Sequence, residues 1–507
     1  MNPWQTLVAT ALVGTGKQAP VLPEAAAALK ATLEQLDWSQ PEQALLSAAG
    51  AIALHQQVGQ QPQKPNWPTV EPCALDDLPN IERATAKQLE TALSSYPAVL
   101  PELLSLIAKA GQRVPAQQLP QLLHLGQQKV ELRPQIIAVI GKRGQWLATH
   151  QVDWGYACLG EADRFLPDAA AAQSIWQSGQ RSERLWLLQR WRQSDPAAAR
   201  AALEAVWSTE LAKEREVFVG GLAINLTMAD EPFLEAALSD RAKGVRQAAI
   251  NLLVSLPASR LCQRMATRIQ PLVQLQTQGQ TLEVEVNLPD SYAPDWERDG
   301  IQATAGSAQG DRSAWLEQIL AATPLDRWGE ATKAIQAVKG HLWQKPLMFA
   351  WGLAAHRQQR IDWAVAWLGA LDLQQPDEHL AERLLALLPP PQKEQQLRDL
   401  WPSGSSQEVL IRWLSLAAQS SQPWNLAFSR WIFAQLVLLL EDQPRNVYLL
   451  VQQIQNLRLT LHPDLAPEAT TAVDRLSHQT SLPPYLESYL LELLAYLRFR
   501  QQIYQVF

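Results

Sequence analysis

The chain has 507 residues, of which 47% are hydrophobic, and this composition excludes a disordered chain. Its length suits two or three domains or one elongated repeat array. The net charge of −7 excludes a globally basic surface for nucleic acid, although a local basic patch stays open.

The stretch ALVGTGKQAP at 11–20 looks like a phosphate-binding loop but lacks the residues that such a loop needs. Ala11 stands where the first glycine should be, and Gln18 stands where a Ser or Thr would hold magnesium. The preceding apolar residues have helical spacing rather than the alternation of a strand. We therefore predict that Gly14 and Gly16 end a first helix, since glycine accepts the left-handed conformation found there.

The next segments are expected to be N-terminal helices over 1–56 and a proline-rich linker over 57–83. The linker contains five prolines and little periodicity, which is typical of an extended strap or connection. No basic region precedes the short apolar run at the N-terminus, so the sequence gives no sign of a secretory signal.

A repeat is visible in the region 84–268. Segments beginning at Arg184, Arg215 and Arg246 are separated by 31 residues each, from 215 − 184 and 246 − 215. Each carries apolar residues three, four and seven places after its arginine, and the segment from Arg133 fits the same template. Shorter helical runs lie between them. A short helix, a turn and a second helix, repeated, predict an α-solenoid.

The clearest unit, 230–257, resembles a HEAT repeat. Asp240 precedes its second helix, and a Val-Arg pair that ends in Arg246 begins that helix. The resemblance implies that such acidic and basic residues pair between neighbouring repeats. Asp240 and Arg246 are therefore the expected structural residues, and we expect Arg246 to pair with Asp240 or with a carboxylate of a neighbouring repeat. Arg215 and Arg184, which lack the valine, offer a weaker parallel.

The helical periodicity of apolar residues is lost over 269–312. Residues 271–289 alternate apolar and polar side chains around the turn sequence TQGQ, which predicts a β-hairpin. Residues 290–313 are rich in Gly, Ser, Asp and Pro, and we expect them to form a mobile loop. Trp296 is the exception in this loop, because so large a ring needs either a binding partner or a pocket. Helical periodicity resumes over 313–507, the C-terminal helical domain. Its apolar stretch at 431–440 is too short to span a bilayer.

Motifs of catalysis and metal binding are not apparent. The eight histidines form no H-x-x-x-H pair, no G-x-S-x-G elbow is present, and the three cysteines (Cys73, Cys158 and Cys262) lack C-x-x-C spacing. Widely spaced cysteines are typical of reduced thiols in a cytoplasmic protein. No cofactor or metal is expected, but an enzyme with a site assembled from distant residues stays an alternative.

Nucleic-acid binding is the second alternative. Residues 181–268 hold thirteen Lys and Arg against ten Asp and Glu, a local excess in an acidic chain. The six to ten phosphate contacts that a typical DNA-binding protein makes would require a larger excess of positive charge, so protein binding is preferred over this function.

Four segments together, 7–20, 122–148, 230–268 and 296–303, resemble an uncharacterised bacterial family known as a domain of unknown function, with HEAT-like helical repeats. The resemblance implies no catalytic residue. Members of that family are similar to accessory proteins encoded near MoxR-type AAA+ ATPases and von Willebrand A-domain proteins.

The sequence thus predicts an all-α protein: a HEAT-like α-solenoid of antiparallel helix pairs with a small β-hairpin insert and a C-terminal helical half. We expect a non-catalytic protein-binding scaffold or adaptor, accessory to an AAA+ ATPase system, with no membrane association. The candidate partner-binding residues are Trp296, Arg298, Asp299, Arg184 and Arg215. The partner's identity and the oligomeric state stay open.

Overall fold

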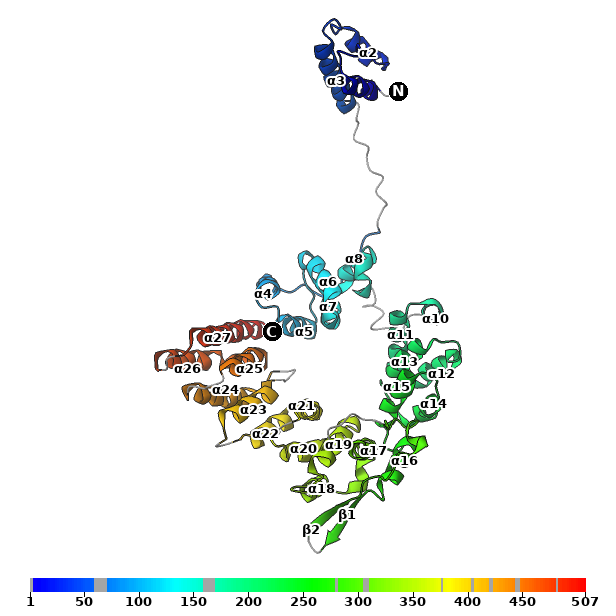
Figure 1. Ribbon diagram of the computed structural model, residues 1–507. Coiled ribbons are helices and arrows are strands. Elements are labelled where there is room, and N and C mark those ends of the chain that lie inside the picture. Colours follow the sequence, from blue (N-terminus) through cyan, green and yellow to red (C-terminus); the bar gives the residue numbers. More distant parts are fainter. Residues whose placement is uncertain are drawn as a thin grey trace. The chain divides into compact units, whose positions relative to one another are not determined.

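A computed structural model describes residues 3–58, 71–157, 169–278, 281–303, 310–374, 377–402, 405–418, 423–442, 447–479 and 482–507. Cys158 and parts of the expected linker and insert loop lie outside these ranges. Within them the chain is helical apart from one two-stranded hairpin, as the sequence predicts (Figure 1). It divides into two compact units, Met1–Pro72 and Cys73–Phe507.

The first unit consists of α1 (Pro3–Val13), α2 (Ala27–Glu34) and α3 (Pro41–Val58). Leu7, Leu33 and Ile52 lie in its small core. Helix α1 ends at Val13, and Gly14 follows with φ of +88° while its N–H donates to the Thr10 carbonyl at 3.0 Å. The prediction that the glycines of 11–20 end a helix is therefore confirmed for Gly14.

The second unit begins with a strap rather than with a helix. Asp77 pairs with Lys142 at 2.7 Å and Asp76 with Arg113 at 3.4 Å, and Asn80 forms a β-bridge with Arg113. Residues 73–82, which the sequence assigned to the linker, are thus bound to the helices that follow. Those helices are α4 (Arg83–Ser94), α5 (Leu100–Lys109), α6 (Leu119–Gln128), α7 (Arg133–Val139) and α8 (Gly141–Thr149).

The repeat seen in the sequence forms stacked helix pairs. The positions three places after Arg184, Arg215 and Arg246 are Leu187, Phe218 and Ala249, and all three are fully buried. Local periodicity therefore selects the face of each helix that enters the core. The helices are α10 (Ala169–Ser178), α11 (Arg181–Ser194), α12 (Pro196–Val206), α13 (Ala212–Gly221), α14 (Glu231–Ala237), α15 (Lys243–Leu253) and α16 (Arg260–Ile269).

The predicted hairpin is confirmed as β1 (Val273–Gln278) and β2 (Thr281–Val286), paired antiparallel with Val273 opposite Val286. Its apolar side chains share one face, which packs against the helical core. Helices resume with α17 (Asp311–Ala321), α18 (Ala331–Ala337), α19 (Gln344–Arg357), α20 (Ile361–Gly369), α21 (Glu378–Leu387), α22 (Pro390–Asp399), α23 (Gln407–Ala418), α24 (Leu426–Glu441), α25 (Val447–Thr460), α26 (Ala466–Gln479) and α27 (Pro484–Tyr504).

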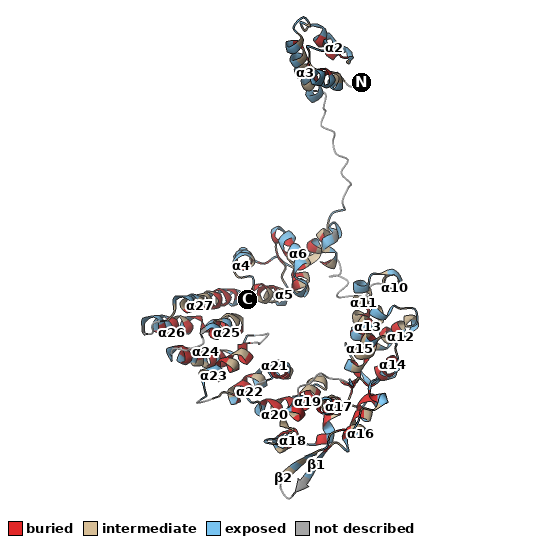
Figure 2. Cartoon of the chain, viewed as in Figure 1, coloured by how far each residue is buried: buried red, intermediate tan, exposed pale blue. Residues whose placement is uncertain are grey.

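The second unit has two hydrophobic cores, and each contains residues from more than one of the segments expected from the sequence. One core runs from Ala172 to Leu497 and continues through the hairpin without a break near 268 or 312 (Figure 2). The other joins residues 81–157 to Tyr496, Phe499 and Ile503 of α27. Helices α4 to α8 therefore extend the C-terminal end of the helical stack, because the apolar face of α27 reaches both cores.

Candidate binding groove

The loop that follows the hairpin is fixed by charges on α16. Its three arginines recur at intervals of four residues, which places them on one face of the helix. The pairs join Arg260 to Glu231 (2.7 Å), Arg264 to Glu235 (2.8 Å) and Asp299 (2.6 Å), and Arg268 to Asp299 (2.6 Å) and Asp295 (2.7 Å). Two guanidinium groups thus neutralise the buried Asp299 carboxylate.

Aromatic packing fixes the same loop. The Trp296 ring is only 9% exposed and lies 5.5 Å from Tyr292 and 5.9 Å from Trp315, measured between ring centroids. The Tyr292 hydroxyl donates a hydrogen bond to the Ile301 carbonyl at 2.6 Å. Of the two environments expected for Trp296, the structure contains the pocket, because rings from the loop and α17 pack together. The loop over 290–303 therefore has more anchoring contacts than its composition suggests.

Gly300 allows the loop to pass close to α15. Its φ is +86°, a conformation that disfavours any residue with a Cβ. A Cβ at this position would also lie 2.7 Å from Cδ1 of Ile250. The close approach brings the backbone of 300–303 alongside α15 and leaves a concave surface between them.

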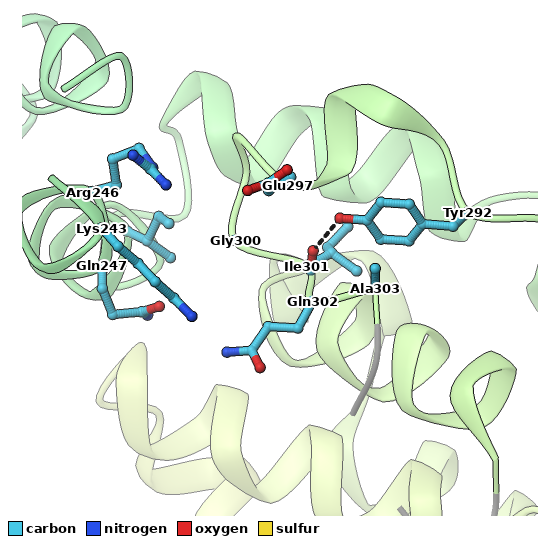
Figure 3. A pocket seen from close by; sticks show the side chains of 10 residues that line it. Lys243, Arg246, Gln247, Tyr292, Glu297, Gly300, Ile301, Gln302 and Ala303 are labelled. Atoms are coloured by element: carbon cyan, nitrogen blue, oxygen red, sulfur yellow. Dashed lines mark hydrogen bonds between the residues drawn. The ribbon is translucent and has the colours of Figure 1, made fainter. Parts of the chain in front are cut away.

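This concave surface consists of two adjoining pockets, which we call the insert groove. The outer pocket has a volume of about 320 Å³, and Lys243, Gln247, Glu297 and Gln302 line it (Figure 3). The inner pocket, of about 230 Å³, continues toward α17 and α19. Both pockets share Gln247, Ile250 and residues 300–302. In Figure 3, Lys243 and Gln247 extend from α15 toward the loop that carries Gln302.

The inner pocket combines apolar and polar side chains. Phe349 and Leu353 of α19 form part of its apolar wall, and Gln318, Glu317 and Arg357 supply polar groups. Burial raises the pKa of Glu317 above its usual value, and the Ser313 hydroxyl only partly opposes this effect. Burial also lowers the pKa of Arg357.

The expected structural pair differs from what the structure contains. The Asp240 carboxylate accepts hydrogen bonds from Arg215 at 2.9 and 3.1 Å, whereas Arg246 donates to the carbonyl oxygens of Asp240 and Arg241. Burial alone would raise the pKa of Asp240, but the Arg215 hydrogen bonds hold it below its usual value. Asp240 thus pairs between neighbouring repeats, as the resemblance implies, but its partner is Arg215 of the preceding helix pair. Arg246 contacts the main chain at Asp240 instead of the Asp240 carboxylate.

The other proposed partner-binding residues also serve the fold. Arg184 pairs with Glu210 and lies over the rings of Trp176 and Phe218, with its guanidinium carbon 5.0 and 4.9 Å from the two centroids. Arg298 is exposed and lies 3.5 Å from Glu235. The local basic excess thus goes largely into internal ion pairs rather than into a free cationic face.

Two residues that the sequence singled out line the groove, since Asp299 lines the inner pocket and Arg246 the outer one. Sequence reasoning missed other lining side chains, among them Lys243, Gln247 and Arg357. Arg357 lies more than fifty residues from Gly300 and more than a hundred from Lys243, and its local sequence HRQQR resembles any polar helix end. No signal in the sequence brings these residues together, since only the packing of α19 beside α15 and α17 does so.

Replacing Gly300 with alanine is expected to loosen the insert loop. The left-handed conformation alone costs a residue with a Cβ about 1–2 kcal/mol, and Ile250 would have to move as well. Hydrogen exchange over 296–303 should accelerate. Gly310→Ala is the control, because Gly310 has a φ of +88° but a Cβ placed there would meet no atom within 4 Å. Equal effects of both changes on 296–303 would contradict the close-approach argument.

Metal ligation and membrane crossing are two further possibilities for such a chain. Over the described ranges, no group of three or more His, Cys, Asp or Glu side chains is arranged to hold a metal ion. In that same part of the chain, no helix has the combination of length and hydrophobicity that crossing a bilayer requires.

Comparison with known proteins identifies a family. A family of unknown function, DUF5691, matches residues 6–507, so the chain belongs to it. No curated protein and no solved structure matches the chain.

Proposed function

We propose that this member of the DUF5691 family is a non-catalytic scaffold that binds a protein partner in the insert groove. The observation that carries the proposal is the fixed position of the loop 290–303, which forms one wall of the groove. Trp296 and Asp299, both buried, attach that wall to α16 and α17. The helical stack on either side supplies the extended surface on which such proteins bind their partners.

The rigidity of the groove favours binding. A surface that is already ordered loses little conformational entropy when a partner docks, so more of the interaction free energy appears as affinity. Here the ion pairs and the aromatic cluster hold the loop without a ligand.

The side chains of the groove suit recognition rather than covalent chemistry. Gln247 and Gln302 each offer both a donor and an acceptor, and Lys243 adds a positive charge. Phe349 is 41% exposed and provides an apolar contact at the inner end. These are groups that position a polypeptide by hydrogen bonds and contact area.

Charge reversal in the groove tests the proposal. Tagged full-length protein would be expressed in the native organism as wild type and as Lys243→Glu, and the proteins retained by each would be quantified by mass spectrometry. Lys339→Glu is the matched control, because Lys339 is exposed and lines neither pocket. We expect at least a tenfold loss of a specific retained protein with Lys243→Glu and none with Lys339→Glu.

A retained protein would then be purified and its affinity for both variants measured by calorimetry. AAA+ ATPases are the first candidates, because the sequence resembles accessory proteins encoded near them. Retention of the same proteins by both variants and by wild type would reject the groove as the docking site.

A further inference from the structure

The inner pocket contains a partly buried cation, Arg357, that has no carboxylate partner among the described residues. Arg357, the last residue of α19, donates from Nη1 to the Ala321 carbonyl at 3.2 Å. Among the described residues, no carboxylate forms an ion pair with its guanidinium. A guanidinium carries five N–H donors, and the bond to Ala321 uses one of them. Arg357 also lines the inner pocket, so a ligand in the pocket could accept from its other donors.

The two arginines that are fully buried among the described residues each have a carboxylate partner. Arg192 and Arg500 are each 0% exposed, and each has a bidentate carboxylate partner, Asp230 and Glu102. A charge removed from water is costly unless a counter-charge and hydrogen bonds replace the hydration. Arg357 is less buried than these two arginines, and within the described part of the chain it lacks the carboxylate partner that each of them has.

Neither acidic side chain of the inner pocket forms an ion pair with Arg357. Asp299 is already neutralised by Arg264 and Arg268. Glu317 is partly buried, and burial raises its pKa above the usual value. An added carboxylate would meet one positive charge, Arg357, that has no carboxylate partner among the described residues.

The outer pocket also contains groups that can bind an acidic peptide. Lys243 is exposed there and forms no ion pair within the described ranges, and Gln247 and Gln302 lie at the junction of the two pockets. A chain that runs from the inner to the outer pocket would meet Arg357 at one end and the amide groups in the middle. At the other end it would meet Lys243 and Arg246 together with one carboxylate, Glu297. Amide side chains match the donors and acceptors of an extended peptide backbone.

We propose that the insert groove binds an acidic peptide segment of the partner, with one Asp or Glu carboxylate held by Arg357 in the inner pocket. This inference rests on the proposed scaffold function and specifies the chemistry of its partner. The inner pocket, at about 230 Å³, accommodates a side chain of this size, and the outer pocket accommodates the residues beside it.

Selection from a random-peptide phage library on immobilised full-length protein tests this inference. We expect the wild type to enrich peptides that contain Asp or Glu, and the synthetic consensus peptide to bind at least tenfold more weakly to Arg357→Gln. The glutamine keeps an N–H for the Ala321 carbonyl but removes the charge. Arg383→Gln is the matched control, since it removes a nearby exposed positive charge that lines neither pocket.

A double-mutant cycle locates the contact. Changing the peptide's acidic residue to its amide should weaken binding to the wild type by the same factor as Arg357→Gln, and the two changes together should cause no further loss. Melting temperatures of both protein variants would establish that each is folded.

Three results would overturn the inference. They are enrichment of peptides without acidic residues, equal binding by Arg357→Gln and wild type, and stabilisation by free glutarate without selection of any acidic peptide. The last result would make the occupant a small carboxylic acid. Loss of partner with Lys243→Glu but not with Arg357→Gln would reject the carboxylate anchor while leaving the scaffold proposal intact.

Discussion

Asp230→Ala is expected to lower the free energy of unfolding by about 3–5 kcal/mol, because it leaves the buried guanidinium of Arg192 without a counter-charge. Both side chains are 0% exposed, and the two carboxylate oxygens accept hydrogen bonds from Arg192 at 2.8 Å. The same carboxylate accepts from Arg200 and from the Thr227 N–H. Chemical denaturation followed by circular dichroism would measure the loss.

Two comparisons identify the buried charge as the cause. Asp195→Ala removes only the N-terminal cap of α12, where Asp195 accepts from the Ala198 N–H, and should cost about 1 kcal/mol. The double change Asp230→Leu with Arg192→Met should be less destabilising than Asp230→Ala, since it removes both charges. A double variant less stable than the single one would contradict this account.

The same pair predicts a dependence on pH. Burial alone would raise the pKa of Asp230, but hydrogen bonds from Arg192, Thr227 and Arg200 hold it below its usual value. Its contribution to stability is therefore present above the usual aspartate pKa of about 4 and is lost as the pH falls through the lower folded value. The difference in stability between wild type and Asp230→Ala should shrink over that acidic interval.

Arg500→Ala is expected to separate residues 81–157 from the helical stack and to lower stability by about 3 kcal/mol, because it strands the partly buried Glu102 carboxylate. Arg500 is 0% exposed and donates to Glu102 at 2.7 and 2.9 Å and to the carbonyl oxygens of Arg458 and Leu461. The Tyr504 hydroxyl adds a third hydrogen bond to Glu102 at 2.7 Å.

Hydrogen exchange would locate the effect. Amides of α4 and α5 should exchange faster in Arg500→Ala, while those of α11 to α15 should stay protected, because the latter belong to the other core. Arg498→Ala is the control on the same helix, since Arg498 is exposed and bonds only the Thr470 hydroxyl within the described residues. Faster exchange throughout the chain, or none in α4 and α5, would contradict the role assigned to this contact.

By itself, the sequence determined the local structure of this protein. Apolar residues at helical spacing after Arg184, Arg215 and Arg246 identified buried helix faces, strict alternation identified the hairpin, and Gly14 marked a helix end. Each of these features follows from residues within about one turn or one strand of each other, so the sequence pattern is sufficient to predict it.

Only the tertiary structure decided which distant residues meet. In the folded protein the Asp240 carboxylate pairs with Arg215 rather than with Arg246. Trp296 is buried against Trp315, and Arg357 lies beside the loop that contains Gly300. The physical reason is that ion pairs, ring contacts and pockets depend on how whole helices pack. Nothing in the periodicity of a single helix specifies which neighbour its side chains will reach.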